Sequence, residues 1–177
     1  MKPHLIILGA GPSPDDGLPF GLQRVTLERR VLDWQLDAFA ELSPEVSFVG
    51  GYDIEQVMRH FPALTYHFNA DWRDTGAVAS LSLAVSALSD LSEGGRDLYV
   101  AYSDILLRPD LVRRLASAPA NAITVAVDDI AAVPHNENSL DAAMHNWLDA
   151  TKEALATRKG LSGITLQTIA ADKIGAL

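Results

Sequence analysis

Short apolar runs alternate along the chain with longer amphipathic stretches. The apolar runs have the length of strands, and they predict strands over residues 5–8, 47–50, 64–68, 97–102, 123–127 and 163–169. The amphipathic stretches between them predict helices over residues 25–42, 53–60, 75–91, 109–116 and 139–157. Strands that alternate with helices indicate βαβ units and a mostly parallel sheet.

Several residues sharpen the helix boundaries. Thr26 is the expected N-cap of the stretch 25–42, whose wide apolar face begins at Leu27, and Asp53 is the expected N-cap of the helix 53–60. Pro109 suits the first turn of a helix, where its missing N–H is not needed. Because ligands of parallel sheets bind at the carboxyl ends of the strands, we expect the loops after residues 8, 68 and 102 to share one rim.

Composition and charge narrow the class of protein. The chain has 177 residues and no cysteine, which favours a single domain over residues 1–177 without disulfides or thiolate chemistry. Its apolar runs are far shorter than the roughly 20 residues of a membrane span, and no signal peptide is evident, so we expect no membrane partner and a cytoplasmic location. A net charge of −9 argues against a nucleic-acid partner. The sequence does not decide the oligomeric state, and a homo-oligomer is one of the alternatives.

The loop after the first strand is rich in glycine, so few side chains cover its backbone. The chain leaves this strand through Leu8, Gly9, Ala10 and Gly11. Glycine-rich loops bind phosphates because their amide N–H groups can approach the anion closely. The alternative is a simple turn at the end of a strand.

Two further segments carry candidate chemistry. Asn69, Thr75, Gly76 and Ser80 lead into a helix whose N-terminus favours an anion, although they equally suit a capped helix that packs closely on the sheet. Asp104 follows an apolar strand, where a carboxylate can hold Mg²⁺ together with substrate phosphates; the alternative is a loop cap.

The order of these segments resembles the nucleotidyltransferases of the sugar-phosphate and phosphocholine cytidylyltransferase type. The resemblance covers roughly residues 4 to 130, and it implies a GT-A-like, Rossmann-like α/β fold, a three-layer α/β/α sandwich, with a divergent or shortened acceptor region after it. The matching segments are residues 8–11, the stretch Leu32-Asp-Trp-Gln-Leu-Asp-Ala-Phe39, and residues 51–57, 68–72, 80–84 and 102–104.

The resemblance implies a reaction. It implies that an anionic oxygen of a small phosphorylated acceptor attacks the α-phosphate of a nucleoside triphosphate, with CTP as the expected one, and that pyrophosphate leaves. Asp104 would hold Mg²⁺ and act in catalysis. The nucleotide would be bound by Leu8, Gly9, Ala10, Gly11, Asn69, Thr75, Gly76 and Ser80. Asp128 or Asp129 would lie near the acceptor.

The chain departs from the family where a Pro-Lys pair is usual, because Pro19-Phe20 stands there. Arg24 is the first cation after the loop and would supply the missing charge, whereas Arg29 and Arg30 are expected on a solvated helix face. Three alternatives stay open: a non-catalytic member that binds a nucleotide or a protein, a GT-A-like glycosyltransferase, and a flavodoxin-like or Rossmann binding module. Tyr102 argues against the second, because an Asp-x-Asp pair would need aspartate there.

Overall fold

The computed structural model describes residues 2–13, 17–87, 97–118, 122–127 and 165–170. The chain divides into two compact units, residues 1–107 and 108–177, which are described separately below. The expectation of a single domain stays a prediction. Among the described residues, no helix is both long enough and apolar enough to cross a membrane.

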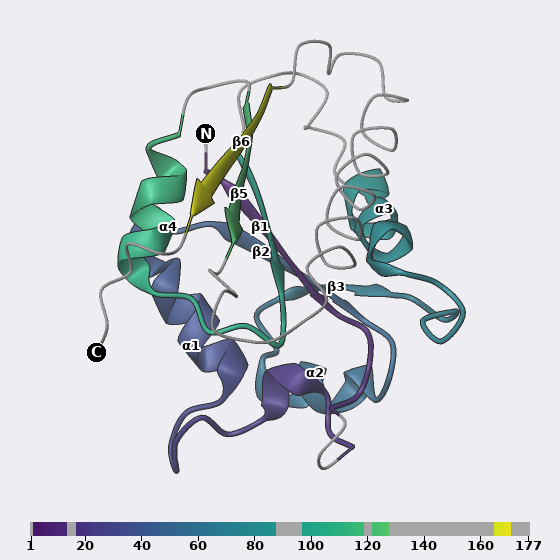
Figure 1. Cartoon of the computed structure of the whole chain (residues 1–177). Coiled ribbons are helices and arrows are strands. Elements are labelled where there is room, and N and C mark those ends of the chain that lie inside the picture. Colours follow the sequence, from purple (N-terminus) through teal and green to yellow (C-terminus); the bar gives the residue numbers. More distant parts are fainter. Residues whose placement is uncertain (1, 14–16, 88–96, 119–121, 128–164, 171–177) are drawn as a thin grey trace, which may run out of the picture. The chain divides into compact units, whose positions relative to one another are not determined.

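The first unit is built on a parallel sheet of four strands in the order β3-β2-β1-β4. Figure 1 labels β1, β2 and β3 of this sheet. The strands are β1 (His4–Gly9), β2 (Glu45–Gly50), β3 (Thr65–Phe68) and β4 (Leu98–Tyr102). β1 is buried along its whole length, as expected for a central strand with both faces covered. The predicted α/β fold with a parallel sheet is confirmed.

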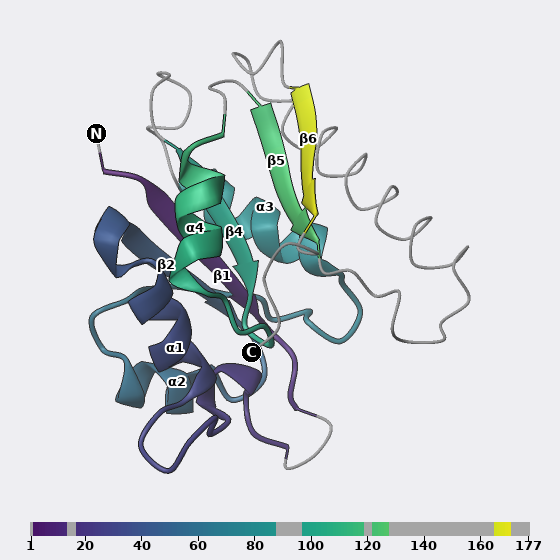
Figure 2. The ribbon, with the colours of Figure 1, turned by 60° about the vertical axis from the view of Figure 1, so that its left-hand side comes forward.

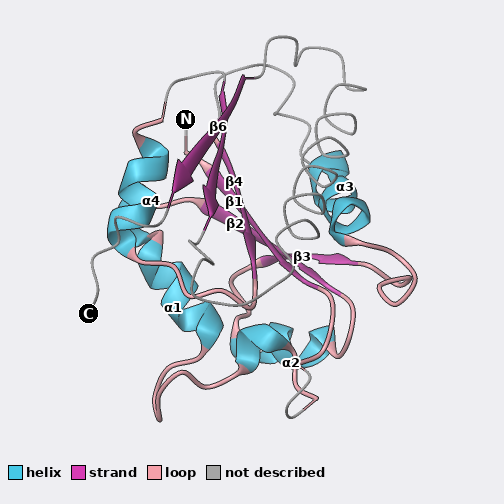
Figure 3. Cartoon of the chain, viewed as in Figure 1, coloured by secondary structure: helices cyan, strands magenta, loops and turns pink. Residues whose placement is uncertain are grey.

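Helices cover both faces of this sheet (Figures 2 and 3). α1 (Val31–Ala38) and α2 (Ile54–His60) lie on one face, where the Tyr66 hydroxyl donates to the backbone oxygen of Phe61 just after α2 at 2.7 Å. α3 (Ala77–Ala87) packs on the other face against β1, β2 and β3. The first unit therefore has three layers.

The second unit contains α4 (Pro109–Ala116) and a parallel pair of strands, β5 (Ala122–Val127) and β6 (Thr165–Ala170). Pro109 occupies the first turn of α4, as predicted. The predicted helix over residues 139–157, together with Asp128 and Asp129, lies outside the described residues.

The predicted helix over residues 25–42 is wrong in its first part. α1 begins at Val31, and the residues before it form a narrow hairpin in which Arg24 pairs with Arg30. Thr26 does not cap α1; its hydroxyl accepts hydrogen bonds from the backbone N–H groups of Glu28 and Arg29 and so closes the hairpin. Leu27 is 90% exposed, so it does not belong to the apolar face.

Short 3₁₀ turns flank α1. η1 (Phe20–Leu22) precedes the hairpin, and η2 (Ala40–Leu42) replaces the last predicted turn of the helix. Asp53 is the N-cap residue of α2, as predicted, with a φ of 45°. Its carboxylate accepts a hydrogen bond from the side chain of Gln56 and does not cap the helix backbone.

Candidate functional site

Backbone hydrogen bonds join the loops at the carboxyl edge of the sheet. Tyr52 N donates to Ala10 O at 2.7 Å, and Asn69 N donates to Gly50 O at 2.8 Å. On the other side of β1, Ser103 N donates to Leu8 O at 2.9 Å. The three predicted site segments therefore lie along the same edge of the sheet, as the sheet order requires.

The loop after β1 is closed by its own backbone. Pro12 pairs with Pro19 in an antiparallel bridge, and Ser13 N donates to Leu18 O at 2.7 Å. Ser13 is buried, and its hydroxyl accepts a hydrogen bond from the Gln23 side chain. Asp15 and Asp16 lie outside the described residues. The loop is thus anchored at its base by hydrogen bonds rather than by ion pairs among its described residues.

The two glycines of this loop have different surroundings. A Cβ on Gly9 would lie 2.5 Å from the Phe48 ring and 2.6 Å from the Ser103 hydroxyl, so packing alone requires glycine there. A Cβ on Gly11 would have no described atom within 4 Å. Of the pair, only Gly11 presents an open backbone to which a ligand could come close.

Asn69, Thr75 and Ser80 form one hydrogen-bonded cluster. The Asn69 side-chain nitrogen donates to the Thr75 hydroxyl at 2.9 Å and to the Ser80 hydroxyl at 3.0 Å, and its oxygen accepts from Asp71 N at 3.1 Å. Asn69 and Ser80 are buried, whereas Thr75 and Gly76 are exposed. The cluster shapes the entry to α3, and it leaves Thr75 and Gly76 as its outward members.

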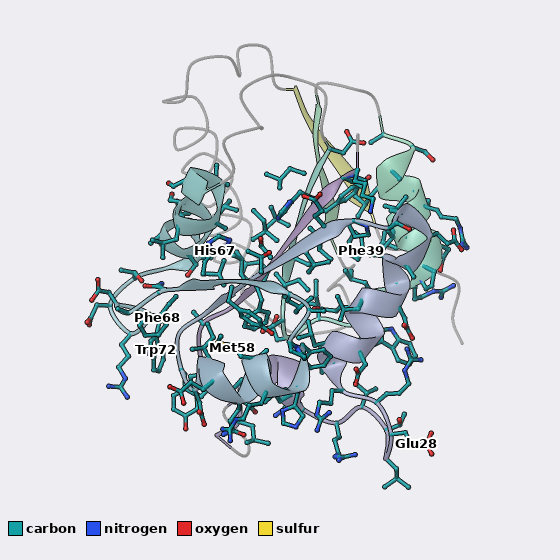
Figure 4. All side chains as sticks on the ribbon, turned by 180° about the vertical axis from the view of Figure 1, so that it is seen from behind. Glu28, Phe39, Met58, His67, Phe68 and Trp72 are labelled. Atoms are coloured by element: carbon teal, nitrogen blue, oxygen red, sulfur yellow. The ribbon has the colours of Figure 1, made fainter. Side chains whose placement is uncertain are left out.

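An aromatic group borders this cluster at the end of β3. Phe68 is 60% exposed, and the rings of Trp72 and Tyr52 pack edge to face with their centroids 5.7 Å apart. Figure 4 labels Phe68 and Trp72 at this end of the sheet. Gly51 makes this possible, because a Cβ there would lie 2.6 Å from the Trp72 ring.

Asp104 lies exposed in the turn that follows β4. Burial raises the pKa of the neighbouring Tyr102 phenol, and the negative charge of Asp104 raises it further. The charge of Asp104 therefore reaches the Tyr102 phenol at the end of β4.

Asp104 fits the chemistry of a magnesium ligand. It is an exposed hard oxygen donor, and Mg²⁺ is commonly held by one or two carboxylates together with substrate phosphates. No group of three or more metal-ligating side chains occurs among the described residues. A metal here would accordingly depend on oxygens from the substrate.

Arg24 lines a cavity of about 420 Å³ in the first unit. None of the other predicted site residues lines it. Arg30 does, so the expectation that Arg30 lies on a solvated helix face is wrong: it precedes α1 and is half-buried. The complete lining consists of Leu18, Leu22, Gln23, Arg24, Arg30, Gln56 and His60.

Sequence reasoning missed the residues that hold the Asp104 turn. The Gln35 side-chain nitrogen donates to Tyr102 O and Ile105 O, and Trp34 Nε1 donates to Leu107 O at 2.9 Å. The available signal was a polar glutamine in the middle of an apolar helix face. Its partners lie 67 and 70 residues away, beyond the reach of local patterns.

No family model and no curated protein sequence matches the chain. Solved structures do resemble it, and three of them follow. The Mycobacterium tuberculosis protein Rv0371c gives a TM-score of 0.60 at 16% identity, over 97% of this chain and 89% of that protein. A nucleotidyl transferase from Methanothermobacter thermautotroptrophicus gives a TM-score of 0.56 at 19% identity, over 70% of this chain and 61% of that protein. The CTP:phosphocholine cytidylyltransferase LicC from Streptococcus pneumoniae gives a TM-score of 0.49 at 21% identity, over 62% of this chain and 50% of that protein.

The two likenesses with TM-scores of 0.56 and 0.60 show the fold. The chain has a nucleotidyltransferase-like α/β fold, as the resemblance in the sequence predicted. It spans 50% and 61% of the length of the cytidylyltransferase and of the archaeal nucleotidyl transferase.

Proposed function

We propose that this chain transfers a nucleotidyl group, CMP from CTP, to a small phosphorylated acceptor and releases pyrophosphate. The observation that carries the proposal is the meeting of the β1 loop, the Asn69 cluster and Asp104 at one edge of a sheet with a nucleotidyltransferase-like fold. The choice of CTP and of the acceptor comes from the sequence resemblance alone.

The proposed roles follow from exposure and contacts. Gly11 and Ala10 offer a half-buried backbone to the nucleotide, while Leu8 and Gly9 hold that backbone against the sheet. Thr75 and Gly76 would face the ligand from the entry to α3, where Asn69 donates to the Thr75 hydroxyl and Ser80 N donates to Gly76 O at 3.3 Å. Asp104 would hold Mg²⁺, which when bound neutralises charge on the triphosphate.

The proposed reaction requires little proton transfer by the protein. The oxygen of a phosphorylated acceptor is already anionic, so positioning and charge neutralisation matter more than a general base. In-line attack on the α-phosphorus forms the new P–O bond as the bond to pyrophosphate breaks. Arg24 is the proposed cation that offsets phosphate charge.

A second function is favoured by one observation. The positions beside the first loop carry Pro19-Phe20, and Arg24 lies in a cavity that the other predicted site residues do not line. A protein that binds the nucleotide without turnover would need less charge neutralisation. The two functions share a binding site and differ in pyrophosphate release.

A pyrophosphate-release assay separates them. The purified chain is incubated with Mg²⁺, each of the four nucleoside triphosphates and a panel of phosphorylated acceptors. We expect release with CTP, its loss in Asp104→Asn, and unchanged release in Glu55→Gln, an exposed carboxylate of α2. Binding of CTP without release from any combination would support the non-catalytic function instead.

A further inference from the structure

Arg24 and Arg30 face one another across the hairpin that precedes α1. Val25 N donates to Arg29 O at 2.8 Å, and Val31 N donates to Gln23 O at 2.9 Å. These bonds flank the Arg24–Arg30 bridge, which makes it a non-hydrogen-bonded antiparallel pair. In such a pair the side chains project to the same side and lie at their closest.

This arrangement places like charges side by side in an acidic protein. Like charges directly opposite one another destabilise a strand pair. The neighbouring Arg29 is balanced, because it pairs with Asp37 and stacks on Trp34. Neither Arg24 nor Arg30 forms a salt bridge with a residue that the structure describes. Glu28, the acidic residue of the hairpin, lies at its far tip (Figure 4).

Both guanidinium-bearing residues line the same cavity of about 420 Å³, and α2 supplies its other wall. His60 Nδ1 lies 2.8 Å from the backbone oxygen of Gln56, which orients the ring on the helix. Arg24 also donates to the backbone oxygen of Leu27, so its side chain is held at the hairpin. Leu18 and Leu22 complete an apolar part of the lining.

We propose that this cavity binds the phosphate group of a small anionic ligand, inorganic pyrophosphate or a phosphomonoester, between Arg24 and Arg30. Guanidinium groups bind phosphate oxygens through paired N–H donors, and the His60 ring lies on the wall of the same cavity. A ligand carrying two negative charges would offset the repulsion between the two arginines. The cavity's part in turnover rests on the proposed nucleotidyl transfer, but its binding of phosphate does not.

The test is a binding measurement without nucleotide and without metal, so a failure of nucleotidyl transfer leaves it unaffected. The full chain is titrated with inorganic phosphate, inorganic pyrophosphate and phosphocholine, by calorimetry and by the shift in Tm. We expect saturable binding of at least one probe. Arg24→Gln and Arg30→Gln should each weaken it tenfold or more and abolish the rise in Tm that the probe gives the wild type. The strongest probe identifies the ligand class.

Arg59→Gln is the matched control, because Arg59 lies next to His60 on α2 but does not line the cavity. It should bind the probe as the wild type does. The proposal is overturned if the wild type binds none of the three probes, or if Arg59→Gln loses as much affinity as Arg30→Gln. It is equally overturned if both cavity variants fold and bind normally.

Discussion

The side-chain nitrogen of Gln35 lies 2.6 Å from the backbone oxygen of Tyr102, and it also donates to Ile105 O at 2.7 Å. One buried amide of α1 thus spans the turn that carries Asp104. The two carbonyl acceptors fix the orientation of this amide, because its nitrogen can donate to them and its oxygen cannot. The Gln35 oxygen itself has no hydrogen-bond partner among the described residues.

Replacing this amide should loosen the Asp104 turn. Gln35→Met keeps the volume but removes both donors, and we expect it to lower the free energy of unfolding by about 1–3 kcal/mol. Gln35→Glu should lower it more, since a carboxylate would face two carbonyl oxygens. Urea unfolding measures both. Trp34→Phe, which removes the single bond to Leu107 O and part of the ring beneath Arg29, should have a smaller effect. Equal stability of Gln35→Met and the wild type would show that the two bonds contribute nothing.

The Tyr102 phenol should report the charge of Asp104. Burial raises the pKa of Tyr102, and Asp104 raises it further because a nearby negative charge disfavours tyrosinate. Asp104→Asn should therefore lower the pKa of Tyr102, while burial keeps it above the ordinary value near 10. Tyrosine ¹³Cζ shifts followed by NMR through alkaline pH measure this. Tyr66, whose pKa is raised by burial alone, is the internal control and should not move.

Local patterns predicted the parts of the fold that depend on local chemistry. The apolar runs of β1 and β2 are buried strands, and Pro109 begins α4 as expected. The predicted helix over residues 25–42 is too long at its start, because Leu27 falls in phase with the apolar face of α1. A hairpin between Gln23 and Val31 overrides that period through its own backbone bonds.

The candidate site likewise has features that the sequence could predict and features that it could not. The sheet order brings Leu8, Asn69 and Asp104 to one edge, which strand alternation alone could predict. The contacts of Gln35 and the facing of Arg24 and Arg30 could not be predicted, since each depends on where a loop turns in space. The bonds of Gln35 hold the turn that carries Asp104, and the two arginines bring positive charge to the cavity beside α2.

His67 should make the stability of the protein depend on pH. Burial lowers the pKa of His67, because the charged ring is poorly solvated there. The unfolded chain then binds more protons between the two pKa values, so stability is full above about pH 6.5 and falls as the pH drops toward the folded-state value. Urea unfolding between pH 8 and pH 5 measures the slope.

The matched variants assign that slope to His67. Figure 4 labels its side chain, and its Nε2 lies 3.3 Å from the hydroxyl of Ser47. His67→Gln should flatten the pH dependence of stability, whereas Thr65→Ser, at an exposed position on the same strand, should leave it as in the wild type. A slope that persists in His67→Gln would assign the effect to another group.

Gly9 and Gly11 offer a comparison between packing and ligand approach. Gly9→Ala should destabilise the fold by about 1–3 kcal/mol, because its Cβ would press on buried Phe48 and Ser103. Gly11→Ala meets no described atom within 4 Å, so its Tm should stay close to that of the wild type. If the nucleotide rests on this backbone, as proposed, Gly11→Ala should raise the KM for the nucleoside triphosphate at least tenfold while the fold stays intact. Thermal unfolding and steady-state pyrophosphate release measure the two effects separately. An unchanged KM in a stable Gly11→Ala protein would remove Gly11 from the nucleotide site.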